Sequence, residues 1–312
     1  MIDSAETLSA SVPETTTAAV TKAETPLGRF LSDYRESKPA VAAFIVFCAL
    51  VFIALFAPHI SPQNPYDLGE IDILDGRLPP GAEGLTGLIH VLGTDDQGRD
   101  MLSAIFYGLR ISLGVGVMSG AIALSIGLTV GLMAAYFGGR FDTVIMRIVD
   151  LQLSFPAILL ALIVLAVLGK GVDKIIIALV AFQWAYYART VRASALVECS
   201  KEYIEAAACL ALSHKRILFR HLLPNVMPPL IVVGTVQVAH AIALEATLSF
   251  LGVGLPLTEP SLGLLIANGF DYMLTGKYWI SFFPGIALLV TIFSINLVGD
   301  QLRDVLNPRL QK

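Results

Sequence analysis

The Gly-Lys pairs at residues 169–170 and 276–277 are the places where this chain could bind the phosphates of a nucleotide. A phosphate-binding P-loop needs Ser or Thr after its lysine and a further glycine five residues before the Gly-Lys pair. Here Gly171 and Tyr278 follow the lysines, and neither pair has the earlier glycine. The sequence therefore predicts that this chain does not hydrolyse ATP, so that any nucleotide energy must come from elsewhere.

Other patterns that carry chemistry are also missing from the sequence. No cluster of His, Cys and Glu has the spacing of a metal site, and no Ser-His-Asp set can be argued from spacing. Cys48 lies in an apolar run, and Cys199 and Cys209 lie beside a charged segment. Because none is expected to reach an oxidising compartment, we predict no disulfide and interpret all three as small apolar side chains. We expect no cofactor, no metal and no enzymatic activity in this chain.

Polar residues inside the apolar run 222–244 are the remaining candidates. Gln237, His240 and Leu244 share one helical face, and Glu245 ends the run. Ionisable residues within a membrane often mark a substrate or ion path, but one histidine and one boundary acid do not form a proton relay. We interpret Glu245 as a structural acid at the outer interface. For His240 a packing role and a pore-lining role stay open, and Gln237 and His240 are our predictions for the substrate path.

Long apolar runs dominate the chain. Of its 312 residues 55% are hydrophobic and only 15% are charged, against about 25% charged in a typical soluble domain. A helix that crosses the roughly 30 Å hydrocarbon layer needs about 20 residues. Because lipid permits only helices and closed barrels, and no alternating strand pattern occurs, we predict an all-α membrane protein with six transmembrane helices. Runs without Asp, Glu, Lys or Arg cover residues 40–57, 111–137, 151–169, 175–188, 222–244 and 278–299.

Lysine and arginine set the expected orientation. With the N-terminus inside, the cytoplasmic segments hold 15 of the 21 Lys and Arg residues, and the outer segments hold 6. The positive-inside rule therefore predicts a multi-pass protein of the inner (plasma) membrane with both termini cytoplasmic. The outer loop 58–107 is acidic, with eight Asp and Glu against Arg77 and Arg99. Because no concentrated basic domain is present, nucleic-acid binding is not expected.

These patterns predict the organisation of the whole chain. A disordered cytoplasmic tail covers 1–38, because this segment is rich in Ser, Thr, Ala and Glu and poor in large apolar residues. The first transmembrane helix, 39–57, is a retained anchor, and an acidic extracytoplasmic loop follows over 58–107. A transmembrane domain over 108–302 precedes a cytoplasmic tail at 303–312. The spans of this domain are about 111–137, 151–169, 174–190, 222–245 and 278–299.

Two pairs of glycines, Gly116/Gly120 and Gly127/Gly131, lie four residues apart in the second predicted span. Glycines at this spacing let helices approach closely in a membrane. We interpret them as helix contacts within the chain, and a contact between subunits is the alternative.

The stretch KEYIEAAACLALSHKRILFRHLLPN, residues 201–225, is charged and lies between two apolar runs. We predict two short amphipathic helices on the cytoplasmic surface. Ser200 can cap the first helix, and Glu202 and Glu205 favour the positive end of its dipole. Its apolar positions recur on one face, at Tyr203, Ala207, Leu210 and Ala211.

The second helix covers residues 214–222. Ser213 can cap it, and Arg216 and Arg220 lie one turn apart. Pro224 predicts a turn into the next span. The alternative is a plain connecting loop whose charges only set the topology.

Glu205-Ala206-Ala207, followed by Ala211 and by Leu223-Pro224, resembles the EAA loop of the membrane subunits of ABC importers. In that family the loop, here residues 198–224, forms a coupling helix that docks into a groove of a separate ATP-hydrolysing subunit. The family usually has glycine where this chain has Ala211. The resemblance implies that the ATPase-coupling residues are Tyr203, Glu205, Ala206, Ala207, Leu210, Ala211 and Arg216.

Further motifs narrow the resemblance. LGTDDQGRDMLSAIFYGLRISL (92–113), EATLSFLGVG (245–254), FPG (283–285) and NLVGDQLRDVLNPR (296–309) are similar to the C-type permease subunit of dipeptide, oligopeptide and nickel ABC importers. The resemblance runs from about residue 40 to the end of the chain. It implies the type I ABC importer permease fold and a pore-forming subunit that moves a small solute.

The same resemblance implies what the chain works with. The expected partners are a homologous B-type permease subunit in a heterodimer, one or two ATP-binding subunits, an extracytoplasmic solute-binding protein and the lipid bilayer. ATP is used by the partner subunits, and the expected solute is a di- or oligopeptide, with nickel or glutathione as other possibilities. The alternatives are an autonomous secondary transporter or channel, and a membrane scaffold that transports nothing.

Overall fold

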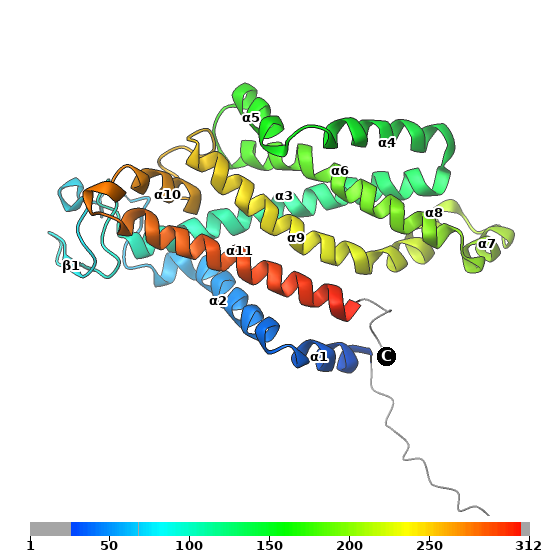
Figure 1. Ribbon diagram of the computed structural model, residues 1–312, viewed down its shortest axis with the longest axis horizontal. Coiled ribbons are helices and arrows are strands. Elements are labelled where there is room, and N and C mark those ends of the chain that lie inside the picture. Colours follow the sequence, from blue (N-terminus) through cyan, green and yellow to red (C-terminus); the bar gives the residue numbers. More distant parts are fainter. Residues whose placement is uncertain (1–25, 68, 307–312) are drawn as a thin grey trace, which may run out of the picture.

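The computed structural model describes residues 26–67 and 69–306 as an elongated bundle of helices (Figure 1). The helices are α1 (Pro26–Glu36), α2 (Lys38–Ile60), α3 (Met101–Phe137), α4 (Gly139–Leu153), α5 (Ala157–Leu168), α6 (Val172–Cys199), α7 (Glu202–Cys209), α8 (His214–Arg216), α9 (Leu223–Phe250), α10 (Leu262–Phe270) and α11 (Trp279–Leu306). A π-helical segment, η2 (Ile217–Leu222), joins α8 to α9, and η1 (Ile73–Asp75) and η3 (Met273–Thr275) are 3-10 turns. Strands β1 (Ala82–Glu83) and β2 (Ile89–His90) form a small antiparallel hairpin, with Ala82 opposite His90.

Four helices in the described part of the chain are long and apolar enough to cross a membrane. They are α2, α3, the continuous helix His214–Phe250 and α11. The predicted span 151–169 is not one continuous helix, because the chain bends by 90° between α4 and α5. The peptide nitrogen of Pro156 has no proton to donate, and the residue before a proline avoids the helical conformation, so the helix stops there. If α4 and α5 count as one broken span, the total is five.

The predicted span 174–190 is helical throughout, as part of α6, which is long enough to cross a membrane but is less apolar than the four helices above. It carries Arg189 and Arg192, which form ion pairs with Asp150 and Asp142 of α4. Nε of Arg192 lies 2.5 Å from Oδ1 of Asp142. These pairs attach α4 to the side of α6 and offset part of the cost of arginine in an apolar bundle.

Several predicted boundaries change for local reasons. Helix α3 begins at Met101 rather than near 111, because Asp100 caps it by accepting a hydrogen bond from the backbone N–H of Ser103 at 2.8 Å. The last seven residues of the predicted outer loop are therefore helical. At the other end, α11 continues to Leu306, into the predicted tail, whose residues 307–312 lie outside the described residues.

The predicted disorder of residues 1–38 is wrong for the part that the structure describes. Residues 26–36 form α1, while 1–25 lie outside the described residues. Tyr34 Oη donates to the backbone oxygen of Ala40 at 3.3 Å, and Gln301 Nε2 donates to the backbone oxygen of Asp33 at 3.4 Å. These bonds hold α1 against α2 and α11, which composition alone does not reveal.

Helix α3 lies at the centre of the bundle, between α6 and α9. Gly116 faces Ile242 of α9, and Gly127 and Gly131 face the backbone of α6. A Cβ atom at Gly127 would lie 2.6 Å from the backbone oxygen of Trp184. The structure therefore favours the interpretation of these glycines as contacts within the chain.

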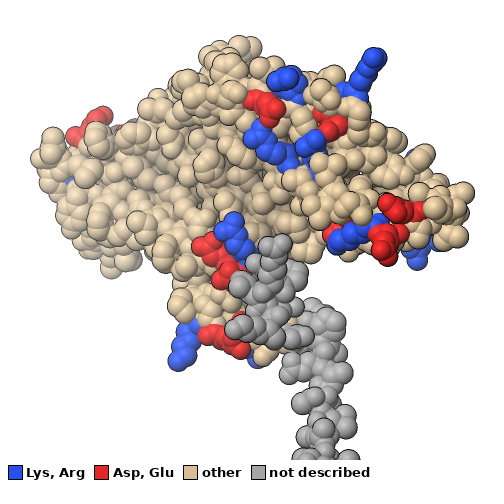
Figure 2. Space-filling model, turned by 45° about the vertical axis from the view of Figure 1, so that its right-hand side comes forward, with Lys and Arg blue, Asp and Glu red and all other residues tan. Residues whose placement is uncertain are grey.

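The two ends of the bundle differ. Figure 1 shows the β1–β2 hairpin and α10 at one end, and α7 and α8 at the opposite end. In Figure 2 the charged side chains on the visible face gather towards the end with α7, and a broad surface leading to the hairpin is uncharged. The segment 201–225 and the acidic loop are thus on opposite ends of the long axis, as their predicted placement on opposite sides of a membrane requires.

Candidate functional site

Of the two predicted N-caps in this segment, Ser200 for α7 and Ser213 for the next helix, only one forms. Ser200 does not cap α7, because the Ser200 hydroxyl donates to the backbone oxygen of Val197 at 2.8 Å. Lys201 occupies the N-cap position, and its side chain makes no capping hydrogen bond. The predicted cap at Ser213 is confirmed. Its Oγ accepts a hydrogen bond from the backbone N–H of Arg216 at 3.4 Å.

The buried face of α7 is formed by Ile204 and Ala207, which pack against Ile217 of η2. The predicted apolar face is wrong except for Ala207. Leu210 is 75% exposed, Tyr203 is 37% exposed, and Ala211 is also exposed. The helix stops at Cys209, so the helical period that linked Tyr203 to Leu210 and Ala211 does not continue that far.

Ala211 ends α7 in a left-handed conformation, with a φ angle of 55°. Two hydrogen bonds close the turn: the N–H of Ala211 donates to the oxygen of Ala208 at 2.9 Å, and the N–H of Leu212 donates to the oxygen of Ala207 at 3.2 Å. This pair is a Schellman motif, whose left-handed position is usually glycine. An alanine there costs roughly 1–2 kcal/mol relative to the right-handed conformation, which gives a physical reason for the glycine that the EAA loop usually carries.

The remaining predicted coupling residues lie on the surface. Glu205, Ala206 and Arg216 are exposed, and the carboxylate of Glu205 has no side-chain partner among the described residues. The predicted turn at Pro224 is wrong, since His214–Phe250 is one continuous helix of 37 residues. Pro224 lies inside this helix directly after the π-helical segment, where the backbone hydrogen-bond pattern is already irregular and its missing N–H is accommodated.

Tyr203 joins α7 to two longer helices. Its hydroxyl donates to Oε2 of Glu198 on α6 at 2.7 Å and accepts from Nδ2 of Asn225 on α9 at 3.2 Å. Lys201 Nζ lies 2.6 Å from Oε1 of Glu198, and Asn225 Nδ2 also donates to the backbone oxygen of His221 at 2.7 Å. We call Tyr203, Glu198 and Asn225 the tyrosine hub.

Electrostatics keep the tyrosine hub in one protonation state. Burial raises the pKa of the Glu198 carboxyl, but the hydrogen bonds from Lys201 and Tyr203 outweigh it, so that the pKa lies below its ordinary value. Burial and the bond to Glu198 raise the pKa of Tyr203 to about 12. Near neutral pH the carboxyl is therefore an acceptor, and the phenol keeps the proton that it donates.

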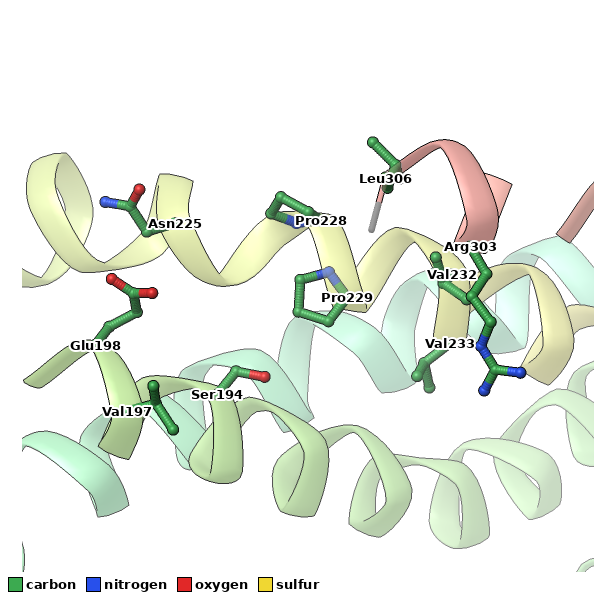
Figure 3. A pocket seen from close by; sticks show the side chains of 10 residues that line it. All are labelled: Ser194, Val197, Glu198, Asn225, Pro228, Pro229, Val232, Val233, Arg303 and Leu306. Atoms are coloured by element: carbon green, nitrogen blue, oxygen red, sulfur yellow. The ribbon is translucent and has the colours of Figure 1, made fainter. Parts of the chain in front are cut away.

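The tyrosine hub borders a cavity of about 630 Å³ between the ends of α6, α9 and α11 (Figure 3). Two of the three hub residues, Glu198 and Asn225, are part of its wall. The cavity is lined by Ser194, Val197, Glu198, Asn225, Pro228, Pro229, Val232, Val233, Arg303 and Leu306.

The two residues predicted to line a substrate path have different surroundings. Gln237 is buried, and its backbone oxygen accepts a hydrogen bond from Nε2 of Gln183 on α6 at 2.9 Å. His240 is exposed on this chain. Helical spacing predicted that Gln237 and His240 share one face of the helix. In the structure α6 packs over Gln237 and leaves His240 exposed.

The position of Glu245 at the end of an apolar run had suggested the outer interface, and this placement is wrong. It is fully buried, and it accepts hydrogen bonds from the hydroxyl of Ser112 at 2.9 Å and of Ser249 at 2.8 Å. The Ser112 bond joins α3 to α9. The acid is therefore structural, as the sequence suggested, but inside the bundle.

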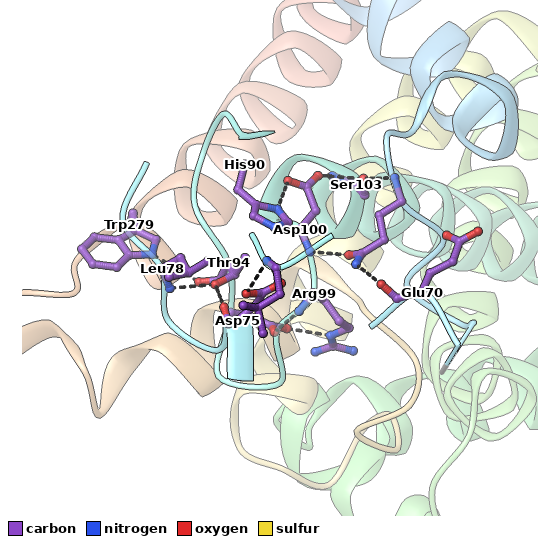
Figure 4. Close-up of polar contacts among 12 residues, drawn as sticks. Glu70, Asp75, Leu78, His90, Thr94, Arg99, Asp100, Ser103 and Trp279 are labelled. Atoms are coloured by element: carbon purple, nitrogen blue, oxygen red, sulfur yellow. Dashed lines mark hydrogen bonds and ion pairs between the residues drawn. The ribbon is translucent and has the colours of Figure 1, made fainter. Parts of the chain in front are cut away.

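The loop between α2 and α3 contains a buried polar network that spacing did not predict (Figure 4). His90 Nδ1 lies 3.1 Å from Oδ1 of Asp100, and Arg99 Nε lies 2.6 Å from Oδ2 of Asp95. Trp279 Nε1 of α11 donates to the backbone oxygen of Thr94 at 3.2 Å. The motif LGTDDQGRD therefore builds a lobe with buried hydrogen bonds and ion pairs, whereas the sequence had indicated only an acidic loop.

Comparison with known proteins decides the family. Residues 127–312 match the family described as "Binding-protein-dependent transport system inner membrane component". The chain belongs to this family. Residues 25–80 also match the N-terminal transmembrane domain of oligopeptide transport permease C. The protein is a pore-forming permease of an ABC importer and a multi-pass protein of the plasma membrane.

Named relatives of the permease cover nearly its whole length. The oligopeptide transport system permease protein OppC of Bacillus subtilis is 37% identical over 279 residues, which are 89% of this chain and 88% of the relative. The di/tripeptide transport system permease protein DppC of Pseudomonas aeruginosa is 35% identical over 286 residues, 92% of this chain and 93% of the relative. Both are permease subunits, in agreement with the resemblance seen in the sequence.

A solved structure has a similar fold. The MetNI methionine ABC transporter, in an inward-facing conformation, aligns with a TM-score of 0.55 at 22% identity, covering 66% of this permease and 98% of the solved chain. The helical core of the permease is therefore that of an ABC importer subunit.

Proposed function

We propose that this permease imports short peptides as one half of a heterodimer with a homologous permease. An extracytoplasmic binding protein delivers the peptide, and one or two separate subunits hydrolyse ATP, since this sequence contains no P-loop. The peptide class is supported by relatives named for oligopeptide and di/tripeptide transport. ATP is thus a substrate of the assembly and not a cofactor of this chain.

The observation that carries this proposal is the exposed surface of α7. Glu205 and Leu210 are exposed, and they belong to the α7 segment, at the end of the bundle opposite the β1–β2 hairpin. An exposed acid without a side-chain partner among the described residues, on a short helix that ends at a 75% exposed leucine, suits a docking contact in which the leucine is buried and the acid meets a polar or basic group. Arg216 lies at the start of the next helical segment and belongs to the same proposed contact.

The proposal also includes the topology. Six spans, with α4–α5 as a broken third span and α6 as the fourth, place both termini and α7 in the cytoplasm. The peptide path then lies between the two permeases near the middle of the membrane. His240, exposed on α9, is proposed to line it, and Gln237 would join it only if α6 moved away.

Reconstitution tests the proposed function. Proteoliposomes containing both permeases, the ATPase subunits and a peptide-loaded binding protein should take up a labelled dipeptide only with ATP. Leaving out the ATPase subunits should abolish uptake. Uptake without them would instead identify an autonomous carrier, and no ATP-dependent flux of any peptide with the complete assembly would favour a scaffold.

A cysteine at position 205 tests the topology. In a background in which Cys48, Cys199 and Cys209 are replaced by serine, Glu205→Cys should react with a membrane-impermeant thiol reagent only after the membrane is opened. The reason is the distribution of 15 Lys and Arg inside against 6 outside. Labelling in intact cells would invert the proposed orientation.

A further inference from the structure

We propose that the cavity between α6, α9 and α11 is this permease's share of the cytoplasmic mouth of the peptide path between the two permeases, and that Tyr203 makes the opening of the cavity follow the position of α7. This inference rests on the proposed function, because it assigns a role in peptide import to a cavity at the cytoplasmic end. It makes Tyr203 a positioning residue, which acts through Glu198 and Asn225 on the cavity wall.

The lining of the cavity suits a short peptide. Its volume of about 630 Å³ lies in the range of sites for small molecules. Its floor of valine and proline accepts varied apolar side chains, and Ser194 and Asn225 offer polar contacts. Arg303 of α11 forms no ion pair with another described residue and can attract a peptide carboxylate. Both carboxylate oxygens of Glu198 already have partners, Lys201 and Tyr203, so Glu198 contributes to the structure of the cavity wall and not to peptide binding.

Tyr203 is the side chain of α7 that bonds to both walls of the cavity. Tyr203 bonds α6 through Glu198 and α9 through Asn225, at 2.7 and 3.2 Å. These two helices form opposite walls of the cavity, as Figure 3 shows for Glu198 and Asn225. A partner that shifts α7 must either carry both walls with it or break these bonds. A conformational change needs contacts that differ between its two states, and the hub supplies such contacts.

Tyr203→Phe tests this role by removing only the hydroxyl. Tyr186→Phe is the matched control, because it also removes only a phenolic hydroxyl. Tyr186 lies in α6, and its hydroxyl has no hydrogen bond among the described residues. Asn225→Ala removes the α9 arm of the hub and is the second test variant. All variants are measured in the complete assembly with its ATPase subunits.

The first measurement is dipeptide uptake per ATP hydrolysed. It should fall roughly tenfold in Tyr203→Phe and in Asn225→Ala, because each loses a hydrogen bond that couples α7 to the wall. Tyr186→Phe should match the parent protein. Parent-like uptake per ATP in both hub variants would overturn the inference.

The second measurement does not depend on peptide. Ser194→Cys, in the background without the native cysteines, places a thiol in the cavity, and inverted vesicles expose it to an impermeant reagent. Trapping the ATPase with a non-hydrolysable nucleotide should slow labelling, and Tyr203→Phe should remove this slowing. Labelling that ignores nucleotide in the parent protein would overturn the inference even if uptake is intact. Nucleotide-sensitive labelling that requires Tyr203 would uphold it even if the solute proved not to be a peptide.

Discussion

Replacing Gly127 with alanine should destabilise the permease by about 3 kcal/mol. The new Cβ would lie 2.5 Å from Cβ of Tyr187, 2.6 Å from the oxygen of Trp184 and 2.8 Å from the nitrogen of Ala188. Carbon atoms pack best at about 3.5–4.0 Å. Two of the three contacts are with backbone atoms of α6, which cannot move without moving the whole helix away from α3.

Thermal unfolding in detergent measures this effect. A loss of about 3 kcal/mol corresponds to roughly a hundredfold change in the folding equilibrium and to a melting temperature lower by about 5–10 °C. Gly114→Ala is the control, because Gly114 lies on an exposed part of the same helix with no atom within 4 Å of its added Cβ. Alanine there should be neutral or slightly favourable. Equal melting temperatures for the two variants would show that α3 and α6 do not pack as described.

Glu205→Lys should lower peptide uptake by roughly ten- to a hundredfold. Its carboxylate is exposed and has no side-chain partner among the described residues, so the change removes no contact within the permease. Such surface changes usually stay within about 0.5 kcal/mol of stability. A charge-assisted hydrogen bond to the ATPase subunit is worth about 1.5–3 kcal/mol, and a lysine would add repulsion to its loss.

Uptake in proteoliposomes and co-purification of the ATPase subunits measure the effect of Glu205→Lys. Glu202→Lys makes the same charge change in the same exposed helix and should keep most of the uptake. An equal loss in both variants would indicate a general effect of charge. Full uptake and normal co-purification in Glu205→Lys would reject the coupling role of this acid.

The length of the apolar runs predicted the long helices well, because a chain that spans lipid has few alternatives to a helix. It could not predict where they start or bend. Asp100 moves the start of α3 to Met101 through a side-chain cap, and Pro156 divides a run that looks continuous in composition. Both effects depend on one residue, which an average over twenty residues conceals.

The candidate site was predicted less completely than the helices. Its location in the segment 201–225 followed from charge, and Ser213 was placed correctly as a cap. The apolar face of α7 was not, because the left-handed Ala211 ends the helical period. The tyrosine hub was missed since Glu198 and Asn225 lie 27 residues apart in the sequence and meet only through tertiary packing.

The continuous helix from His214 to Phe250 has a mechanical consequence. Its 37 residues extend for about 55 Å at 1.5 Å per residue. Such a rod acts as a lever: a tilt of about 5° about one end displaces the other by about 5 Å. The π-helical segment at Ile217–Leu222 is its irregular turn, and such turns are found where helices yield. We expect this turn to be the pivot, so that a small rotation imposed beside α7 is magnified at the far end of the helix.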